Sequence, residues 1–120
     1  MEAKIITNIV IDLFESDSPV VIPAKQGDSD SRFILGTIKG SGEVFLLDET
    51  FVVKANFLRG DGERFSVSAE TADGKALFQI PEEVLEFPER VKGDISIEDA
   101  DDRKLTTSLF YIQVEPSCSA

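Results

Sequence analysis

Apolar and polar side chains alternate along most of this 120-residue chain, and the alternation predicts β-strands with one buried face. β-Branched and aromatic residues, which favour strands, carry the pattern. The inward sets are Val53, Ala55 and Phe57; Phe65, Val67 and Ala69; Ala76, Phe78 and Ile80; Val91, Ile95 and Ile97; Phe110, Ile112 and Val114; and, less cleanly because of Ile6 and Val10, Ile5, Ile9, Ile11 and Leu13. We expect these sets to meet in one hydrophobic core.

Turn-forming residues separate the strand segments. Asp73-Gly74 predicts a type I′ hairpin, because this dipeptide tolerates two successive positive φ angles. Two glycines in residues 59–63 suit a second hairpin loop, and residues 16–19 form a further turn cluster. Pro23 ends an apolar run and predicts an edge strand or a strand end, since proline cannot donate a ladder hydrogen bond.

The alternation breaks at residues 81–87, where a proline precedes acidic residues and predicts one short helical turn. Seven or eight strands with almost no helix predict an all-β fold, specifically a two-sheet antiparallel immunoglobulin-like β-sandwich. The length suits one domain. We expect a single β-sandwich domain over residues 1–115 and a disordered tail over residues 116–120.

The charge balance narrows the choice of partners. The chain has 12 Lys plus Arg against 23 Asp plus Glu, a net charge of -11. Such a chain repels phosphate backbones, so we expect no nucleic acid partner. Its longest apolar runs are a few residues, far below the roughly 20 that cross a bilayer, and its first residues do not resemble a signal peptide. We therefore expect no membrane partner.

The missing residue types argue against catalysis. The chain has no histidine, which excludes Ser-His-Asp and Cys-His catalysis and the commonest zinc sites. The single cysteine, Cys118, has no second thiol for a disulfide or a metal site, which fits synthesis in a reducing host cytoplasm. The sequence predicts a protein that is not an enzyme and that has no cofactor and no metal.

Three motifs suggest a specific function, but each also has a simpler structural interpretation. Arg59-Gly60-Asp61 is the tripeptide of some integrin ligands, but turn chemistry alone also favours glycine and aspartate there. The acidic stretch 98–102 could collect oxygen ligands for Ca²⁺, but it lacks the central glycine and distal glutamate of the twelve-residue calcium loop. Glu82 and Glu83 could suggest a glycosidase pair, yet on an exposed turn nothing separates their proton affinities.

Several stretches read together resemble one family. They are Val21-Ile22-Pro23-Ala24-Lys25-Gln26-Gly27-Asp28 with Ser31-Arg32-Phe33; Asp73-Gly74-Lys75-Ala76 through Ile80-Pro81-Glu82-Glu83-Val84-Leu85; Val91-Lys92-Gly93-Asp94-Ile95; and Leu105-Thr106-Thr107 with Phe110-Tyr111-Ile112-Gln113-Val114. Over residues 4–114 the chain resembles the N-terminal domain of the baseplate upper proteins of tailed phages and prophages of Gram-positive bacteria.

This resemblance implies a structural virion protein. It implies a β-sandwich that docks on the core of the tail-tip baseplate and links the core to host-adsorption components. The partners would be other phage structural proteins, and symmetric tails imply a homo-oligomer or several copies in the virion. Nothing after Ala120 could act as a stalk, so we expect either a truncated protein or an attachment domain alone.

The most family-like stretch is Gln26, Gly27 and Asp28, which we interpret either as a partner-contact loop or as a tight turn capped by the aspartate. Four phenylalanines outside the inward sets could form an exposed apolar patch or pack at strand ends; they are Phe14, Phe45, Phe51 and Phe87. Two alternative functions stay open. One is a capsid-decorating or head-fibre base module with the same fold. The other is a carbohydrate-binding module, weakened by a chain with no tryptophan and one tyrosine.

Overall fold

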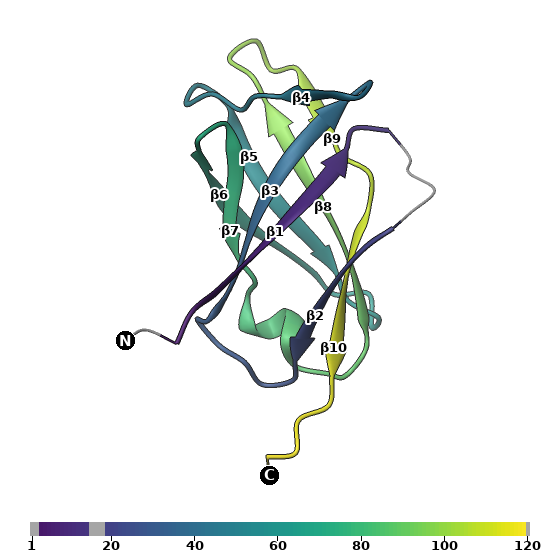
Figure 1. Cartoon of the computed structure of the whole chain (residues 1–120). Coiled ribbons are helices and arrows are strands. Elements are labelled where there is room, and N and C mark those ends of the chain that lie inside the picture. The colour runs from purple at the N-terminus through teal and green to yellow at the C-terminus, as the bar shows by residue number, and fades with distance from the viewer. Residues whose placement is uncertain (1–2, 15–18, 120) are drawn as a thin grey trace.

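The computed structural model describes residues 3–14 and 19–119 and shows an all-β chain with almost no helix (Figure 1). Within those residues there are ten strands and one short 3₁₀ helix, so the expectation of seven or eight strands is too low. The strands are β1 (Ile5–Asp12), β2 (Val20–Lys25), β3 (Arg32–Gly40), β4 (Glu43–Phe45), β5 (Val52–Leu58), β6 (Arg64–Ala72), β7 (Lys75–Gln79), β8 (Arg90–Glu98), β9 (Lys104–Thr106) and β10 (Phe110–Glu115), and the 3₁₀ helix is Glu82–Leu85. Two of the ten, β4 and β9, have only three residues each, too few for a clear alternation of apolar and polar side chains.

The strands follow one continuous path in the order β1-β3-β7-β6-β5-β8-β10-β2, with β4 added to β3 and β9 added to β8. Strand β6 joins the two halves of the path. Its first part pairs with β5, as in Val53 opposite Ala69, and its last part pairs with β7, as in Thr71 opposite Ala76. The path therefore turns back around the core and gives a nearly barrel-shaped sheet (Figure 1).

Two of the pairings correct the sequence-based expectation. Strand β1 runs parallel to β3, with Ile5 opposite Arg32, and β10 runs parallel to β2, with Phe110 opposite Val20. The sheet is therefore mixed, the expectation of purely antiparallel pairing is wrong for these strands, and the immunoglobulin-like two-sheet sandwich is not confirmed. The physical reason is that β2 leaves β1 for the other half of the barrel, so the next strand of the chain returns to β1 in the same direction.

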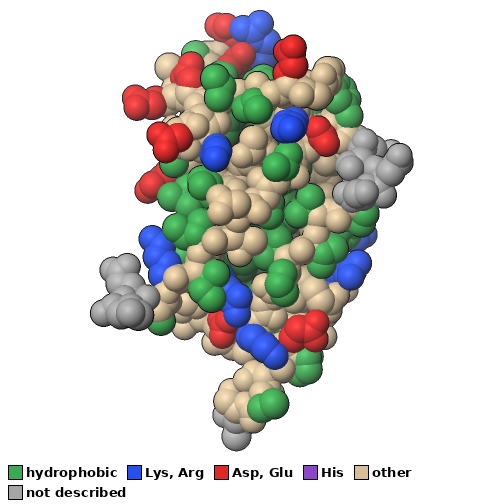
Figure 2. All heavy atoms as spheres, in the orientation of Figure 1, with side chains coloured by type: hydrophobic (Ala, Val, Ile, Leu, Met, Phe, Trp, Pro, Cys, Tyr) green, Lys and Arg blue, Asp and Glu red, His purple; other side chains and the backbone are tan. Residues whose placement is uncertain are grey.

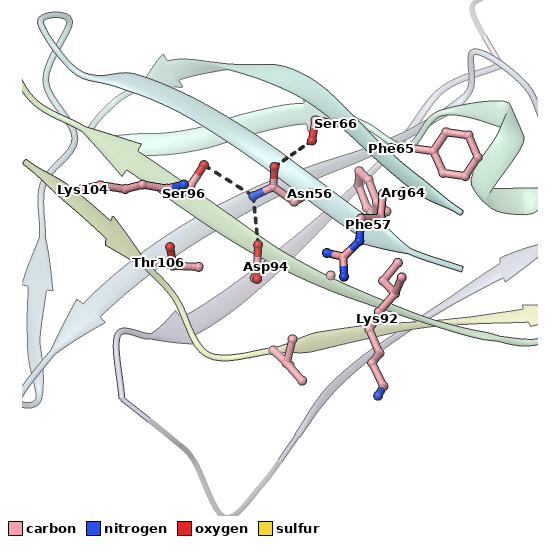
Figure 3. A pocket seen from close by; sticks show the side chains of 13 residues that line it. Asn56, Phe57, Arg64, Phe65, Ser66, Lys92, Asp94, Ser96, Lys104 and Thr106 are labelled. Carbon is pink, nitrogen blue, oxygen red and sulfur yellow. Dashed lines mark hydrogen bonds between the residues drawn. The ribbon is translucent and has the colours of Figure 1, made fainter. Parts of the chain in front are cut away.

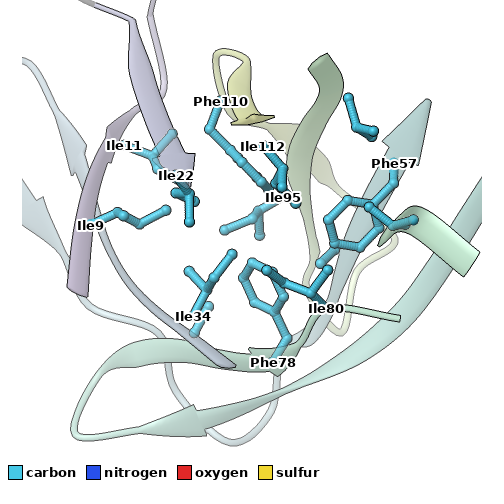
Figure 4. Packing of buried hydrophobic residues seen from close by; sticks show 14 of the residues in the cluster. Ile9, Ile11, Ile22, Ile34, Phe57, Phe78, Ile80, Ile95, Phe110 and Ile112 are labelled. Atoms are coloured by element: carbon cyan, nitrogen blue, oxygen red, sulfur yellow. The ribbon is translucent and has the colours of Figure 1, made fainter. Parts of the chain in front are cut away.

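The core confirms most of the predicted inward sets. The rings of Phe57, Phe78 and Phe110 meet at its centre with 6.1 Å between the centroids of each pair (Figure 4). The predicted inward residues of β5, β7, β8 and β10 are all buried. Those of β6 are only partly buried against this cluster, because β6 forms the corner between the two halves. Ile5 was expected inside but is 54% exposed at the start of an outermost strand.

The turn and helix predictions are also confirmed. Asp73 and Gly74 have φ of 51° and 78° and connect β6 to β7 as a two-residue hairpin, as a type I′ turn requires. The 3₁₀ helix falls inside the predicted range and closes one end of the barrel with two buried side chains, Val84 and Leu85 (Figure 1). Pro23 lies in β2, an outermost strand of the path.

Two predictions are not tested by the structure: the turn cluster at residues 16–19 and the boundary between the domain and its tail. The predicted turn cluster at residues 16–19 lies, except for its last residue, outside the described residues. Strand β10 ends at Glu115, where the predicted domain ends. The single-domain boundary and the disordered tail over residues 116–120 stay predictions.

Candidate functional site

The predicted contact loop follows β2 and is tied firmly to the rest of the barrel. The Gln26 backbone N–H donates to the Glu115 carbonyl at 2.9 Å, and the Gly27 N–H donates to the Leu85 carbonyl at 2.9 Å. The Gln26 side-chain amide reaches the Glu86 carbonyl at 3.1 Å. Gly27 has φ of 86°, a conformation that favours glycine. The loop is therefore held between the end of β10 and the 3₁₀ helix.

Asp28 completes this loop through a different interaction from the one we expected. Its N–H closes a turn onto the Lys25 carbonyl at 3.3 Å. Its carboxylate does not cap that turn but accepts a hydrogen bond from Arg32 Nε at 2.8 Å. The turn of the alternative interpretation is thus present, whereas the contact role of Gln26, Gly27 and Asp28 stays a prediction.

The loop borders an acidic depression of about 430 Å³ at the end of the barrel. The remaining lining residues are Glu82, Glu83, Glu86, Ser117 and Ser119. None of the residues that line it is a lysine or an arginine. Glu82 and Glu83 are both exposed. Two of the four carboxylates that line the depression pair with arginines, Asp28 with Arg32 and Glu86 with Arg59, so its exposed negative charge comes mainly from Glu82 and Glu83. This charge lies beside a loop whose backbone is fixed, an arrangement that favours a basic partner surface.

The Arg59 side chain joins the loop after β5 to the segment of the 3₁₀ helix at this end of the barrel. Its side chain is 9% exposed and donates to Asp61 at 2.6 Å and to the Glu86 carboxylate at 2.6 Å. A third hydrogen bond runs from its Nη1 to the Glu83 carbonyl at 2.9 Å. The hydrogen bond to Asp61 raises the pKa of Arg59 above its ordinary value and lowers the pKa of Asp61. These contacts fix the 3₁₀ helix to the loop after β5.

The same guanidinium lies between two aromatic rings, 5.2 Å from the Phe65 centroid and 4.9 Å from the Phe87 centroid. An integrin ligand must present its arginine to solvent, whereas Arg59 is turned inward. The Arg59-Gly60-Asp61 tripeptide therefore stabilises the loop after β5 and its contact with the 3₁₀ helix. Sequence reasoning predicted the turn but missed the central role of Arg59, because Phe87 and Glu86 approach it only through the fold.

The acidic stretch near residue 99 is also organised by an arginine. The Asp99 carboxylate accepts the N–H groups of Asp101 and Arg103 at 2.9 Å and the Arg103 Nε at 2.8 Å. The backbone N–H of Arg103 is the main cause that lowers the pKa of Asp99. A second nitrogen of Arg103 binds Asp101 at 2.8 Å. Throughout residues 3–14 and 19–119, no three His, Cys, Asp or Glu side chains are grouped as metal ligands.

A polar groove of about 320 Å³ lies on the outer face of β5, β6 and β8 (Figure 3). At its centre Asn56 donates to Asp94 at 2.9 Å and accepts from the Ser66 hydroxyl at 2.8 Å. Arg64 and Lys92 are also among the lining residues. The polar side chains at its centre bind one another. The groove was not predictable from the sequence, because its residues are spread over several strands.

The four phenylalanines outside the inward sets divide between the two interpretations. Phe45 and Phe51 are partly buried against the core and stack on each other at 6.1 Å. Phe14 and Phe87 are 62% and 45% exposed. Strand-end packing therefore explains the first pair, and only the second pair is available for contacts at the surface.

No helix in the described part of the chain is long and apolar enough to cross a membrane. Comparison with curated proteins gives no match. Among solved structures, the chain is similar to the N-terminal domain of phage TP901-1 ORF48, with a TM-score of 0.68, 19% sequence identity, and coverage of 92% of this chain and 98% of that one. At that identity the likeness shows the shared fold.

The match to a family is more specific than the match to a fold. A model described as the BppU N-terminal domain, the N-terminal domain of baseplate upper proteins, matches residues 5–120. This family consists of phage baseplate structural proteins, so its members are components of the virion. The expected resemblance is confirmed over nearly the entire chain, and the chain belongs to the BppU N-terminal domain family.

Proposed function

We propose that this domain is a non-enzymatic attachment module that docks on the core of the tail-tip baseplate and links that core to host-adsorption components. The observation that carries the proposal is the family match over residues 5–120. It favours a position in the tail over the alternative of a capsid-decorating or head-fibre base module. The protein is made in the host cytoplasm and acts in the assembled particle.

The docking surface is the acidic end of the barrel, with Gln26, Gly27 and Asp28 at its border. Two observations support this choice. The loop is held by hydrogen bonds to Leu85 and Glu115, so its backbone loses little freedom on binding. Four carboxylates and no lysine or arginine line the depression beside it, and two of these carboxylates, Glu82 and Glu83, are exposed. We infer that the partner surface is basic.

The partners are other phage structural proteins, and the domain is present in several copies. The net charge of -11 opposes binding to nucleic acid, whose phosphates carry the same sign. Shape and charge complementarity, rather than chemistry on a substrate, is the mechanism. Electrostatic steering of this kind weakens as the salt concentration rises.

The test measures binding of the domain to the reconstituted baseplate core proteins of the same phage. Glu82→Lys combined with Glu83→Lys should weaken binding at least about tenfold and reduce its salt dependence, because both charges face the partner. The matched control reverses two exposed glutamates near the opposite end of the barrel, Glu43→Lys with Glu49→Lys, and should leave binding unchanged. Equal effects of the two double variants would contradict the assignment of the acidic end.

The polar groove supports a second candidate function, that of a carbohydrate-binding module. The hydrogen-bonding side chains of Asn56, Ser66 and Asp94 could bind sugar hydroxyls there. The only tyrosine of the chain does not line the groove. Calorimetric titration with cell-wall glycans tests this function. Saturable binding that Asn56→Ala abolishes would favour it, and no heat of binding would remove it.

A further inference from the structure

The groove on β5, β6 and β8 carries a charge opposite in sign to that of the whole chain. Its lining includes three cationic side chains, Arg64, Lys92 and Lys104, and all three are exposed. Its one carboxylate, Asp94, already accepts a hydrogen bond from Asn56. Figure 3 shows Lys104 at one end of the groove and Arg64 with Lys92 toward the other. In a chain with a net charge of -11, the groove is therefore a local excess of positive charge.

A second depression extends this positive charge beyond the groove. It has a volume of about 240 Å³, shares Leu58 and Lys92 with the groove, and adds Arg90. No aspartate or glutamate lines it. We call the groove and this depression the basic surface. Within residues 3–14 and 19–119, four cations of the basic surface belong to no ion pair: Arg64, Arg90, Lys92 and Lys104.

Strand register places two of these cations on either side of one apolar side chain. Arg64 of β6 and Lys92 of β8 both lie opposite Leu58 of β5. Side chains at directly paired positions lie on the same face of a sheet. Neighbouring strands are about 4.8 Å apart, so the Cα atoms of the two cations are about 10 Å apart. Two carboxylates that approach together can therefore pair with both cations.

The other half of the barrel has a different surface. Figure 2 shows hydrophobic side chains over the middle of the face formed by β1, β3 and β7, with charged side chains of both signs mainly toward its rim. One of the cations there, Lys4, lies over the Phe33 ring with its Nζ 4.4 Å from the centroid. An acidic partner therefore meets more unpaired positive charge on the basic surface than on this face.

The acidic end of the barrel supplies two carboxylates of the required kind. Glu82 and Glu83 are successive, exposed residues of the 3₁₀ helix, and in the described part of the chain neither forms an ion pair. Successive side chains of a 3₁₀ helix point about 120° apart, so the two carboxylates spread toward two separate cations. The acidic end and the basic surface are complementary in charge, and no ion pair joins them within the described residues. The match is therefore open to a second copy.

We propose that the basic surface of one copy of this chain receives the acidic end of a second copy. Arg64 and Lys92 then lie against the partner subunit's Glu82 and the partner subunit's Glu83. The contact is head-to-tail, because it joins two different surfaces, and its repetition gives a ring or a filament. A copy whose acidic end docks on the baseplate core keeps its basic surface free. That copy can therefore hold a further copy that does not itself touch the core.

This inference rests on the proposed docking role of the acidic end and names the neighbouring copy as a second place where that end binds. The net charge of -11 opposes association of two copies. At physiological ionic strength, however, exposed charges are screened beyond about 8 Å, whereas charges in contact still attract. Exposed ion pairs contribute little each, so we expect the isolated domains to associate weakly and reversibly.

Sedimentation equilibrium of the full chain at physiological ionic strength tests the contact. Association of the wild type should increase with concentration. A groove variant, Arg64→Glu with Lys92→Glu, should lower the association constant at least about tenfold, because like charges then face one another. An end variant, Glu82→Gln with Glu83→Gln, should lower it about fivefold, because two ion pairs are lost. The control, Lys4→Glu with Lys75→Glu, makes the same change in net charge on the other half of the barrel and should leave association unchanged.

A mixture of the groove variant and the end variant tests the head-to-tail arrangement. The end variant keeps its basic surface and the groove variant keeps its acidic end, so one contact forms between them. The mixture should give dimers with wild-type affinity and no larger species, which also shows that both variants are folded. A wild type that stays monomeric at every concentration, or a mixture that associates no better than the separate variants, would overturn the proposal.

Binding to the reconstituted baseplate core separates this inference from the docking proposal. The groove variant should bind the core with wild-type affinity but in fewer copies per core, whereas the end variant should lose affinity for the core itself. A groove variant that binds in as many copies as the wild type would overturn this inference and leave the docking proposal intact. An end variant that binds the core like the wild type would count against the docking proposal, whatever the copies do in solution.

Discussion

Gly93 and Phe110 lie directly opposite each other in the antiparallel pair of β8 and β10. The Phe110 ring covers the Gly93 backbone so closely that a Cβ atom at position 93 would be 2.5 Å from two ring carbons. Phe110 is fully buried and packs against the rings of Phe57 and Phe78. The glycine therefore makes room for the aromatic centre of the core.

Gly93→Ala should destabilise the fold by about 1–3 kcal/mol, because the added methyl group forces the ring out of its place. The control is Gly36→Ala, since the nearest atom to a Cβ there is a methyl carbon of Ile95 at 3.5 Å. Urea unfolding followed by circular dichroism measures both variants. A loss of stability no greater for Gly93→Ala than for Gly36→Ala would contradict the close contact.

Phe110→Ala should cost about 3–5 kcal/mol, because it leaves a cavity between two other aromatic rings. Phe14→Ala should change the free energy of unfolding by less than about 0.5 kcal/mol, because Phe14 is 62% exposed. The same urea titration measures both. Similar losses for the two variants would show that the aromatic centre does not hold the barrel together.

The local sequence pattern predicted most of the strands and one hairpin turn, because these elements depend on residues that are neighbours in the chain. The alternation of Val53, Ala55 and Phe57 identified the buried face of β5, and Asp73-Gly74 identified the turn between β6 and β7. The parallel pairing of β1 with β3 was not predictable in this way. This pairing depends on the position of the intervening strand β2, which pairs with β10, and no residue in β1 or β3 indicates that position.

The candidate site was likewise predictable only in part. Sequence similarity identified Gln26, Gly27 and Asp28 as a feature of the family, and the structure shows what holds this loop in place. Arg59 looked like part of a turn. Its partners Glu86 and Phe87 are more than twenty residues away in the chain, and only the position of the 3₁₀ helix brings them to it.

Arg59→Lys should lower the urea midpoint of unfolding, although it keeps the positive charge. A lysine cannot bind Asp61, Glu86 and the Glu83 carbonyl at once, because it lacks the planar fork of the guanidinium. The control Arg64→Lys changes an exposed arginine and should leave the midpoint unchanged. Equal midpoints for the two variants would mean that the Arg59 contacts do not stabilise the fold.

The free energy of unfolding should fall at acidic pH, and protonation of Asp99 and Asp48 should cause part of this loss. Hydrogen bonds from Arg103 and from Thr50 lower the folded-state pKa of Asp99 and Asp48 below the ordinary 3.8. Each carboxylate therefore stabilises the fold above the unfolded-state pKa, and the contribution is lost as the pH falls through the lower folded-state value.

Asp99→Asn should therefore be less stable than the wild type at neutral pH, and its stability should depend less on pH below roughly pH 5. Urea midpoints measured from neutral pH down to acid give both results in one series. Asp48→Asn should behave in the same way. Curves that stay parallel to that of the wild type across the acidic range would contradict the role of these carboxylates.

We propose that the domain attaches to the tail-tip baseplate of a phage particle. Immunogold electron microscopy of intact particles, with an antibody raised against the domain, tests this attachment. We predict label at the tail tip. Label on the head, or particles that carry no label when the denatured particle proteins also lack the domain, would contradict this attachment.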